Sequence, residues 1–148
     1  MFEIESKQPD EITIITKKIT IKFNIADAVI DAGLAVGKIT GPGEFEIGDA
    51  TIRGVATESG KTLYDVEIGG IHTGIIGGTE ENLDDIVADI LCTSSVRAIR
   101  EIEPKLIVSM GNVDAMVSEL KLSARTEKKL KIKNLDSLPT VREVVVLN

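Results

Sequence analysis

The spacing of apolar residues along the sequence changes near Thr79. Before that point, short apolar or alternating runs are separated by turn-forming pairs such as Gly48-Asp49, Ser59-Gly60 and Gly69-Gly70. Such pairs at short, regular intervals are typical of hairpins, so the first half predicts an antiparallel meander. The expected strands cover residues 12–16, 18–23, 26–30, 45–47, 50–56, 62–68 and 71–76.

After Thr79, helical and strand patterns alternate. Leu83, Ile86, Val87 and Ile90 have the spacing of an amphipathic helix, which Thr79 would cap and which would end before Ile90. Two further helices are expected, the first capped by Ser94 or Ser95 and ended by Pro104, the second capped by Asn112. Strands are expected at 89–93, 106–108, 129–133 and 143–147.

This order predicts one α/β (α+β) domain over residues 1–148, with antiparallel strands first and βα units after them. The βα units imply right-handed crossovers and a partly parallel sheet. The length of 148 residues suits a single domain with one core, and we see no linker or internal repeat.

Composition excludes several classes of protein. One Cys rules out an internal disulfide framework, and one His with one Cys rules out most zinc sites built within one chain. The net charge of -7 argues against a dedicated nucleic-acid or anionic-membrane binder. The N-terminus lacks a signal-peptide pattern, and no apolar run is long enough to span a membrane, so we expect a cytoplasmic protein.

Ligands of such sheets bind at the carboxyl ends of the parallel strands. Here those ends are expected at 77–79, 93–95 and 110–112, and they hold glycines, hydroxyls and one amide. No His, Cys, Asp or Glu stands there, which is a poor set for metal hydrolysis or acid–base catalysis. We interpret Ser94 and Ser95 as helix caps and not as catalytic nucleophiles, because neither lies in a nucleophile elbow.

Other motifs favour structural interpretations. Gly60-Lys61-Thr62 ends like a phosphate-binding loop, but it lacks the earlier Gly and the following helix, so we predict a hairpin turn. The glycines at 74–78 predict a tight strand-to-helix turn, since Glu80 and Glu81 follow them and would repel an anion. The acidic cluster at 80–89 predicts a solvated helix face, with cation binding as the alternative. His72 is a weak candidate for a direct role and is otherwise a satisfied strand residue.

Charge is unevenly distributed along the chain. The last 28 residues carry 7 basic and 3 acidic side chains, or +4, so the first 120 carry -11. The lysines of the basic segment 121–133 are expected to guard an edge strand. Nucleic-acid binding is the alternative, but no aromatic residue is interleaved for base stacking. A further use of the asymmetry is head-to-tail self-association.

One segment resembles a known family. Gly41-Pro42-Gly43-Glu44-Phe45-Glu46-Ile47, followed by 50–55, is similar to the Gly-Pro-Gly-Glu-(Tyr/Phe)-Glu-Ile loop of the metallo-β-lactamase-like hydrolases, in particular of a small bacterial branch classed as zinc-dependent hydrolases. Later segments keep that branch's order, including 102–110 and 143–147. The resemblance covers 41–147 well and 12–33 loosely. It implies a metallo-β-lactamase-like sandwich, in which Gly41, Pro42, Gly43 and Glu44 form a structural loop.

The departures from the family concern its metal site. The family's metal-binding His-x-His-x-Asp-His motif is absent, since His72 is the only His. By the resemblance, Gly78 stands at the bridging Asp position and Gly111 at the final His position, and Ser94 belongs to the same vestigial edge. The segment 24–40 is too short for the usual strand, loop and helix. The resemblance therefore implies a degenerate, shortened member whose metal-site portion is reduced.

We expect a non-catalytic protein without cofactor or metal, acting as an interaction or assembly module. Loss of a covering helix would leave an apolar sheet face open, so we expect a homo-oligomer or a protein partner that contacts the N-terminal side. One alternative is a metal-dependent hydrolase whose site is completed across a subunit interface by His72 or the acidic segment. The other is a sensor that binds a small ligand or nucleotide at the strand ends.

Overall fold

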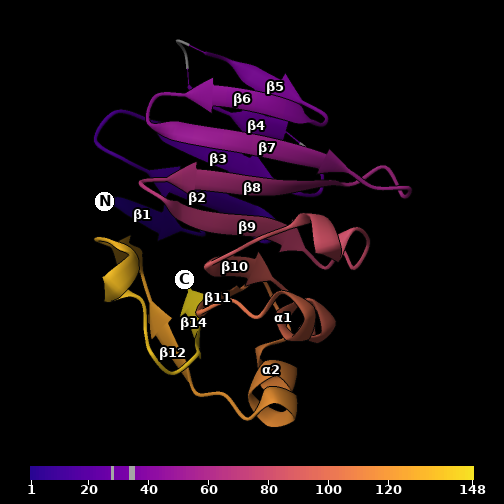
Figure 1. Ribbon diagram of the computed structural model, residues 1–148, viewed down its shortest axis with the longest axis vertical. Helices are drawn as coiled ribbons and strands as arrows, with labels where there is room; N and C mark the ends of the chain where they lie inside the picture. Colours follow the sequence, from indigo (N-terminus) through magenta and orange to yellow (C-terminus); the bar gives the residue numbers. More distant parts are fainter. Residues whose placement is uncertain (28, 34–35) are drawn as a thin grey trace.

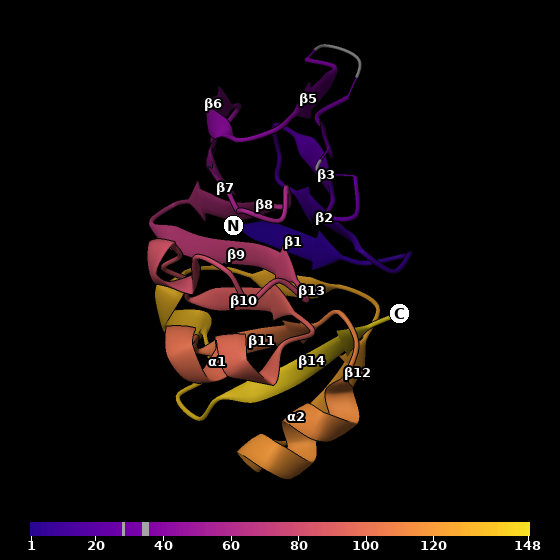
Figure 2. The same cartoon turned by 90° about the vertical axis from the view of Figure 1, so that its right-hand side faces the viewer.

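Two β-sheets pack face to face, with both helices on the outer side of one of them (Figures 1 and 2). The computed structural model describes residues 1–27, 29–33 and 36–148. Among the described residues, no helix is long and apolar enough to cross a membrane. The fold is thus a strand-rich α+β sandwich, and the expected fold class is confirmed.

The six-stranded sheet is antiparallel throughout and has the order β13-β1-β2-β3-β4-β5. Its inward side chains alternate with polar outward ones, as Ile21 and Phe23 do with Lys22. The strands are β1 (Phe2–Glu5), β2 (Glu11–Ile15), β3 (Thr20–Asn24), β4 (Val29–Asp31), β5 (Lys38–Thr40) and β13 (Leu130–Ile132).

The eight-stranded sheet contains both antiparallel and parallel strands. It is antiparallel from β6 to β9 and parallel from β9 through β10, β11 and β14 to β12. The expected change from antiparallel strands to a partly parallel sheet is confirmed, but β12 was not expected. β10 is buried on both faces, which explains its continuous apolar pattern. The strands are β6 (Gly43–Ile47), β7 (Ala50–Ala56), β8 (Thr62–Ile68), β9 (Ile71–Gly77), β10 (Ile90–Thr93), β11 (Leu106–Ser109), β12 (Ala124–Glu127) and β14 (Glu143–Leu147).

Two apolar clusters hold the layers together. The larger one fills the space between the sheets and includes Phe23 packed against Tyr64, with ring centroids 5.4 Å apart. The smaller one lies between the eight-stranded sheet and α1 (Val96–Ile102) and α2 (Val113–Leu120). Two short 3₁₀ helices complete the described elements, η1 (Leu83–Asp85) and η2 (Leu135–Ser137).

The chain crosses between the sheets at both edges of the sandwich. At one edge β5 continues into β6 through Gly41 and Pro42, and at the other β12 continues into β13 through residues 128–129. Gly41 and Gly43 have φ of +78° and +145°, which favour glycine. A Cβ at Gly54 of the neighbouring strand would lie 3.3 Å from the Cα of Pro42. The loop at 41–44 therefore forms a tight corner between the two sheets.

The expected helix after Thr79 is wrong. Only the single turn η1 forms, Ile86 is already extended, and Val87 is 66% exposed. Asn82 has a left-handed φ of +56°, which breaks a helix at that point. Like-charged pairs four residues apart, such as Glu81 and Asp85, also disfavour a helix here. The segment instead lies flat on β9, where Gly74 leaves room for Ile86 and Ala88.

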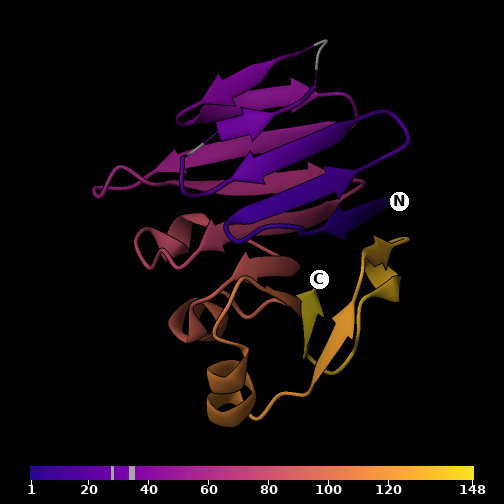
Figure 3. The ribbon, with the colours of Figure 1, turned by 180° about the vertical axis from the view of Figure 1, so that it is seen from behind.

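The expectation of an open apolar face is also wrong for the described residues. No described helix packs on the six-stranded sheet, and its outer face is open (Figure 3). That face is polar, because β1 to β5 direct their charged and hydroxyl side chains outward. One row across the sheet reads Glu5, Thr13, Lys22, Asp31 and Lys38.

Some predicted segments reach beyond the described residues. The strand expected at 26–30 contains residue 28, and the segment 24–40 contains residues 28, 34 and 35, which lie outside them. The described remainder forms β4 and β5. The edge position predicted for the lysine-flanked strand is confirmed, since β13 is an edge strand with Lys131 exposed between buried Leu130 and Ile132.

Candidate functional site

The carboxyl ends of β9, β10 and β11 meet at one edge of the eight-stranded sheet. Thr93 Oγ1 donates a hydrogen bond to the Gly77 carbonyl at 2.7 Å, and the Ser94 amide donates to the same carbonyl at 2.9 Å. The Met110 amide in turn donates to the Thr93 carbonyl at 2.8 Å. These bonds lock the three strand ends together, so the loops that follow them share one location.

The structure brings Gly78, Ser94 and Gly111 together at this edge. A Cβ built on Gly78 would lie 3.0 Å from Ser94 Oγ, and one built on Gly111 would lie 3.8 Å from Ser94 Cβ. The Asn112 side chain donates to the Ser94 carbonyl at 3.3 Å. The cluster is thus assembled from small side chains and backbone groups.

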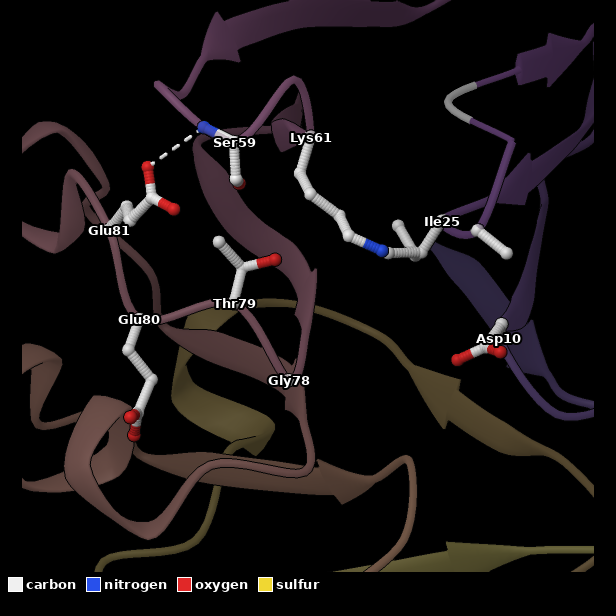
Figure 4. Close-up of a pocket in the computed structure, with 9 residues that line it drawn as sticks. Asp10, Ile25, Ser59, Lys61, Gly78, Thr79, Glu80 and Glu81 are labelled. Atoms are coloured by element: carbon white, nitrogen blue, oxygen red, sulfur yellow. Dashed lines mark hydrogen bonds between the residues drawn. The ribbon is translucent and has the colours of Figure 1, made fainter.

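Two open clefts border this edge. The first has a volume of about 480 Å³ and contains Gly78 in its lining, together with Lys61 from the β7–β8 turn (Figure 4). The second has a volume of about 600 Å³ and is lined by Gly111, Met110 and the last residues of β14. Asp10, in the β1–β2 loop, lines both clefts. We call the first one the Lys61 cleft.

His72 lies elsewhere. It stands near the start of β9, five residues before the strand end at Gly77, which places it about 16 Å from that edge. Its Nδ1 is 3.0 Å from Asp65 Oδ1, and Arg53 Nη2 is 3.7 Å from Asp65 Oδ2. The side chain of Asp65 is only 8% exposed, so His72 and Arg53 compensate a buried carboxylate.

Two of these residues, Arg53 and His72, also hold the segment after β9. Arg53 donates a hydrogen bond to the Asp85 carbonyl, and the His72 amide donates to Asp89 Oδ2 at 2.9 Å. Because Asp85 and Asp89 flank the extended stretch that lies on Gly74, this network fixes the segment against the sheet. Sequence reasoning missed Asp65 and Arg53, since nothing in a single sequence pairs them with His72 before the strand register is known.

The other singled-out residues have mainly structural surroundings. Gly60 has a φ of +84° in the turn between β7 and β8, so the hairpin predicted at 60–62 is confirmed. Ser95 caps α1, accepting from the Ala98 amide at 3.0 Å while its hydroxyl donates to Glu80. Asn112 precedes α2 in a left-handed conformation without a side-chain cap. Burial raises the pKa of the Cys92 thiol, which keeps it protonated and unreactive.

A zinc ion does not fit the residues at the strand-end edge. Zinc sites in proteins use several His, Cys, Asp or Glu ligands, and this edge presents Gly78, Ser94 and Gly111. Elsewhere in the described part of the chain, no group of three or more such side chains could hold a metal ion. The donor set therefore disagrees with the chemistry that the family resemblance implies.

Comparison with solved structures identifies the fold. A Thermotoga maritima protein, described as a "putative Zn-dependent hydrolase of the metallo-β-lactamase superfamily", superposes with a TM-score of 0.71 at 18% sequence identity. The match covers 99% of this chain and 98% of that chain. The fold is metallo-β-lactamase-like. Neither a scan against protein-family models nor a search of curated proteins finds a match. The metallo-β-lactamase-like architecture predicted from the 41–47 loop is therefore confirmed at the level of the fold.

Proposed function

We propose that this chain is a non-catalytic protein with a metallo-β-lactamase-like fold, which serves as an interaction or assembly module. One observation carries the proposal: the strand ends that would form a metal centre converge on Gly78, Ser94 and Gly111. These residues provide no His, Cys or carboxylate ligand. A hydrolase of this chemistry needs a metal ion to polarise the substrate or activate water.

The position of His72 supports the same proposal. A single imidazole near the opposite end of β9, engaged with buried Asp65, cannot reach the strand-end edge of its own chain. The rival function, a hydrolase whose site is completed by a second subunit, would have to assemble that site from His72 or the acidic segment 80–89 of two chains.

Metal content separates the two functions. Protein purified without a histidine tag, dialysed and analysed by inductively coupled plasma mass spectrometry should contain zinc, iron and manganese far below one ion per chain. A stoichiometric metal would overturn the proposal. In that case His72→Ala should remove the metal if the site lies across an interface, whereas Ser94→Ala, which deletes only a hydroxyl at the strand ends, should retain it.

The proposed assembly uses the open face of the six-stranded sheet. This face carries an alternating row of charges and no described helix covers it. Contacts made through such a face would be polar and sensitive to salt. A homo-oligomer is the form of assembly that we propose.

A further inference from the structure

The Lys61 cleft contains two opposite charges that do not neutralise each other. Lys61 and Asp10 both line it, yet none of the ion pairs formed by the described residues, within 4.0 Å, involves either side chain. Two opposite charges that share a cleft without touching leave space for a molecule that contacts both.

The other carboxylates of the cleft are already engaged. Glu81 accepts a hydrogen bond from the Ser59 amide at 3.3 Å, and Glu80 accepts from the Ser95 hydroxyl that caps α1. These bonds give Glu80 and Glu81 structural partners. Within the described residues, Lys61 and Asp10 are therefore the charged groups of the cleft whose side chains make neither a hydrogen bond nor an ion pair.

The two groups reach the cleft from different parts of the fold. Lys61 comes from the β7–β8 turn and Asp10 from the β1–β2 loop. Figure 4 shows the Asp10 carboxylate across the cleft from Gly78, below Ile25, while the Lys61 side chain crosses toward Ile25. Asp10 has a φ of +60°, a costly conformation for a residue other than glycine, and its carbonyl is held by the Ile25 amide at 2.9 Å. The loop backbone is thus held in place at Asp10.

The floor and wall of the cleft suit a small molecule with a short apolar body. Thr79 offers a hydroxyl, Gly78 lines the cleft without a side chain and Ile25 adds an apolar surface. A volume of about 480 Å³ lies within the range of small-molecule sites. A purely anionic ligand would be repelled by the carboxylates of Asp10, Glu80 and Glu81, and a purely cationic ligand would leave Lys61 without a counter-charge.

From this geometry we propose that the Lys61 cleft binds a small zwitterion, with a ligand carboxylate on Lys61 and a ligand ammonium on Asp10. The inference goes beyond the assembly function and needs no metal. The distance between the two charges of the ligand can then be measured. The separation of Lys61 from Asp10 should favour one length of the chain that joins the ligand's carboxylate to its ammonium.

A series of ω-amino acids tests the proposal directly. Glycine, β-alanine, 4-aminobutyrate, 5-aminovalerate and 6-aminohexanoate are titrated into the full chain, and amide shifts are followed by NMR. We expect residues around Lys61 and Thr79 to shift and one spacer length to bind best. Butyrate and butylamine, which each lack one charge, should bind at least about tenfold more weakly than the best member.

Matched variants distinguish the site from nonspecific binding. Lys61→Met keeps an apolar stem, and Asp10→Asn keeps a residue that tolerates a positive φ, so both should fold. Each should weaken binding of the best ω-amino acid by at least about tenfold. Lys7→Met, in the neighbouring cleft, should leave it unchanged. Absence of shifts with every member of the series, or equal binding by Lys61→Met and the unmodified chain, overturns the proposal.

Discussion

At the scale of single residues, Asp65 places a buried carboxylate on β8, in the eight-stranded sheet. It is compensated by His72 at 3.0 Å and Arg53 at 3.7 Å, and the same partners hold the segment after β9. A carboxylate with 8% exposure needs such partners, since an unpaired buried charge is costly. The one His of the chain thus has a buried carboxylate as its partner.

Asp65→Ala should therefore destabilise the protein by about 1–3 kcal/mol, because it removes the shared partner of Arg53 and His72. Urea unfolding followed by circular dichroism measures the change. Glu101→Gln is the matched control, since it removes one partner of an exposed pair with Arg97 and should shift stability by less than about 0.5 kcal/mol. Equal effects of the two substitutions would contradict the role assigned to Asp65.

Cys92 offers a second prediction at this scale. Its side chain lies between the sheets, and burial raises its thiol pKa, so little thiolate exists at pH 7–9. Reaction with a disulfide reagent such as dithionitrobenzoate should be slow in native buffer and complete within minutes in concentrated urea. Rapid labelling of the folded protein would show that the sandwich opens more readily than its packing implies.

At the scale of elements, α1 depends on one cap. Ser95 accepts from the Ala98 amide and donates to Glu80, whereas the neighbouring Ser94 makes no side-chain hydrogen bond within the described residues. Ser95→Ala should cost about 0.5–2 kcal/mol of unfolding free energy, and Ser94→Ala close to none. Thermal unfolding compares the two variants, whose substitutions lie at neighbouring positions. A larger loss of unfolding free energy for Ser94→Ala than for Ser95→Ala would contradict the assignment of Ser95 as the cap of α1.

Hairpin chemistry and burial on both faces made most strands predictable. The expected segments 50–56 and 62–68 coincide with β7 and β8, because glycine-containing turns bracket them. The failure after Thr79 shows the limit of periodicity. Leu83 and Ile86 are buried as expected, but Leu83 lies in the single 3₁₀ turn η1 and Ile86 is already extended. β12 was missed because Ala124–Glu127 lacks any apolar pattern and pairs only with β14.

The candidate site was predictable only in part. Topology alone placed Gly78, Ser94 and Gly111 at one edge, since parallel strands end together. Lys61 and Asp10 could not be linked in the same way, because they lie 51 positions apart, in loops of different sheets. Their juxtaposition follows from how the two sheets pack, which no local sequence pattern encodes.

At the scale of the whole molecule, the two outer faces differ in kind. Both helices pack on the eight-stranded sheet, while the six-stranded sheet presents an open row of Glu5, Lys22, Asp31 and Lys38. A helix on this face would have to bury these charges, so the outward residues of β1 to β5 suit contact with water or with another polar surface.

We therefore predict a homo-oligomer that forms through this face and weakens with salt. Multi-angle light scattering at micromolar concentration should give more than one chain per particle at about 0.05 M salt and a smaller mass at about 0.5 M, since screening acts on exposed charges. Lys22→Glu, at the centre of the row, should shift the mass toward the monomer at low salt. Lys121→Glu makes the same charge change just after α2 and should leave the mass unchanged.

A strict monomer at low salt would contradict assembly through the six-stranded sheet. A mass that does not fall as the salt concentration rises would indicate an apolar contact instead, because screening acts only on charges.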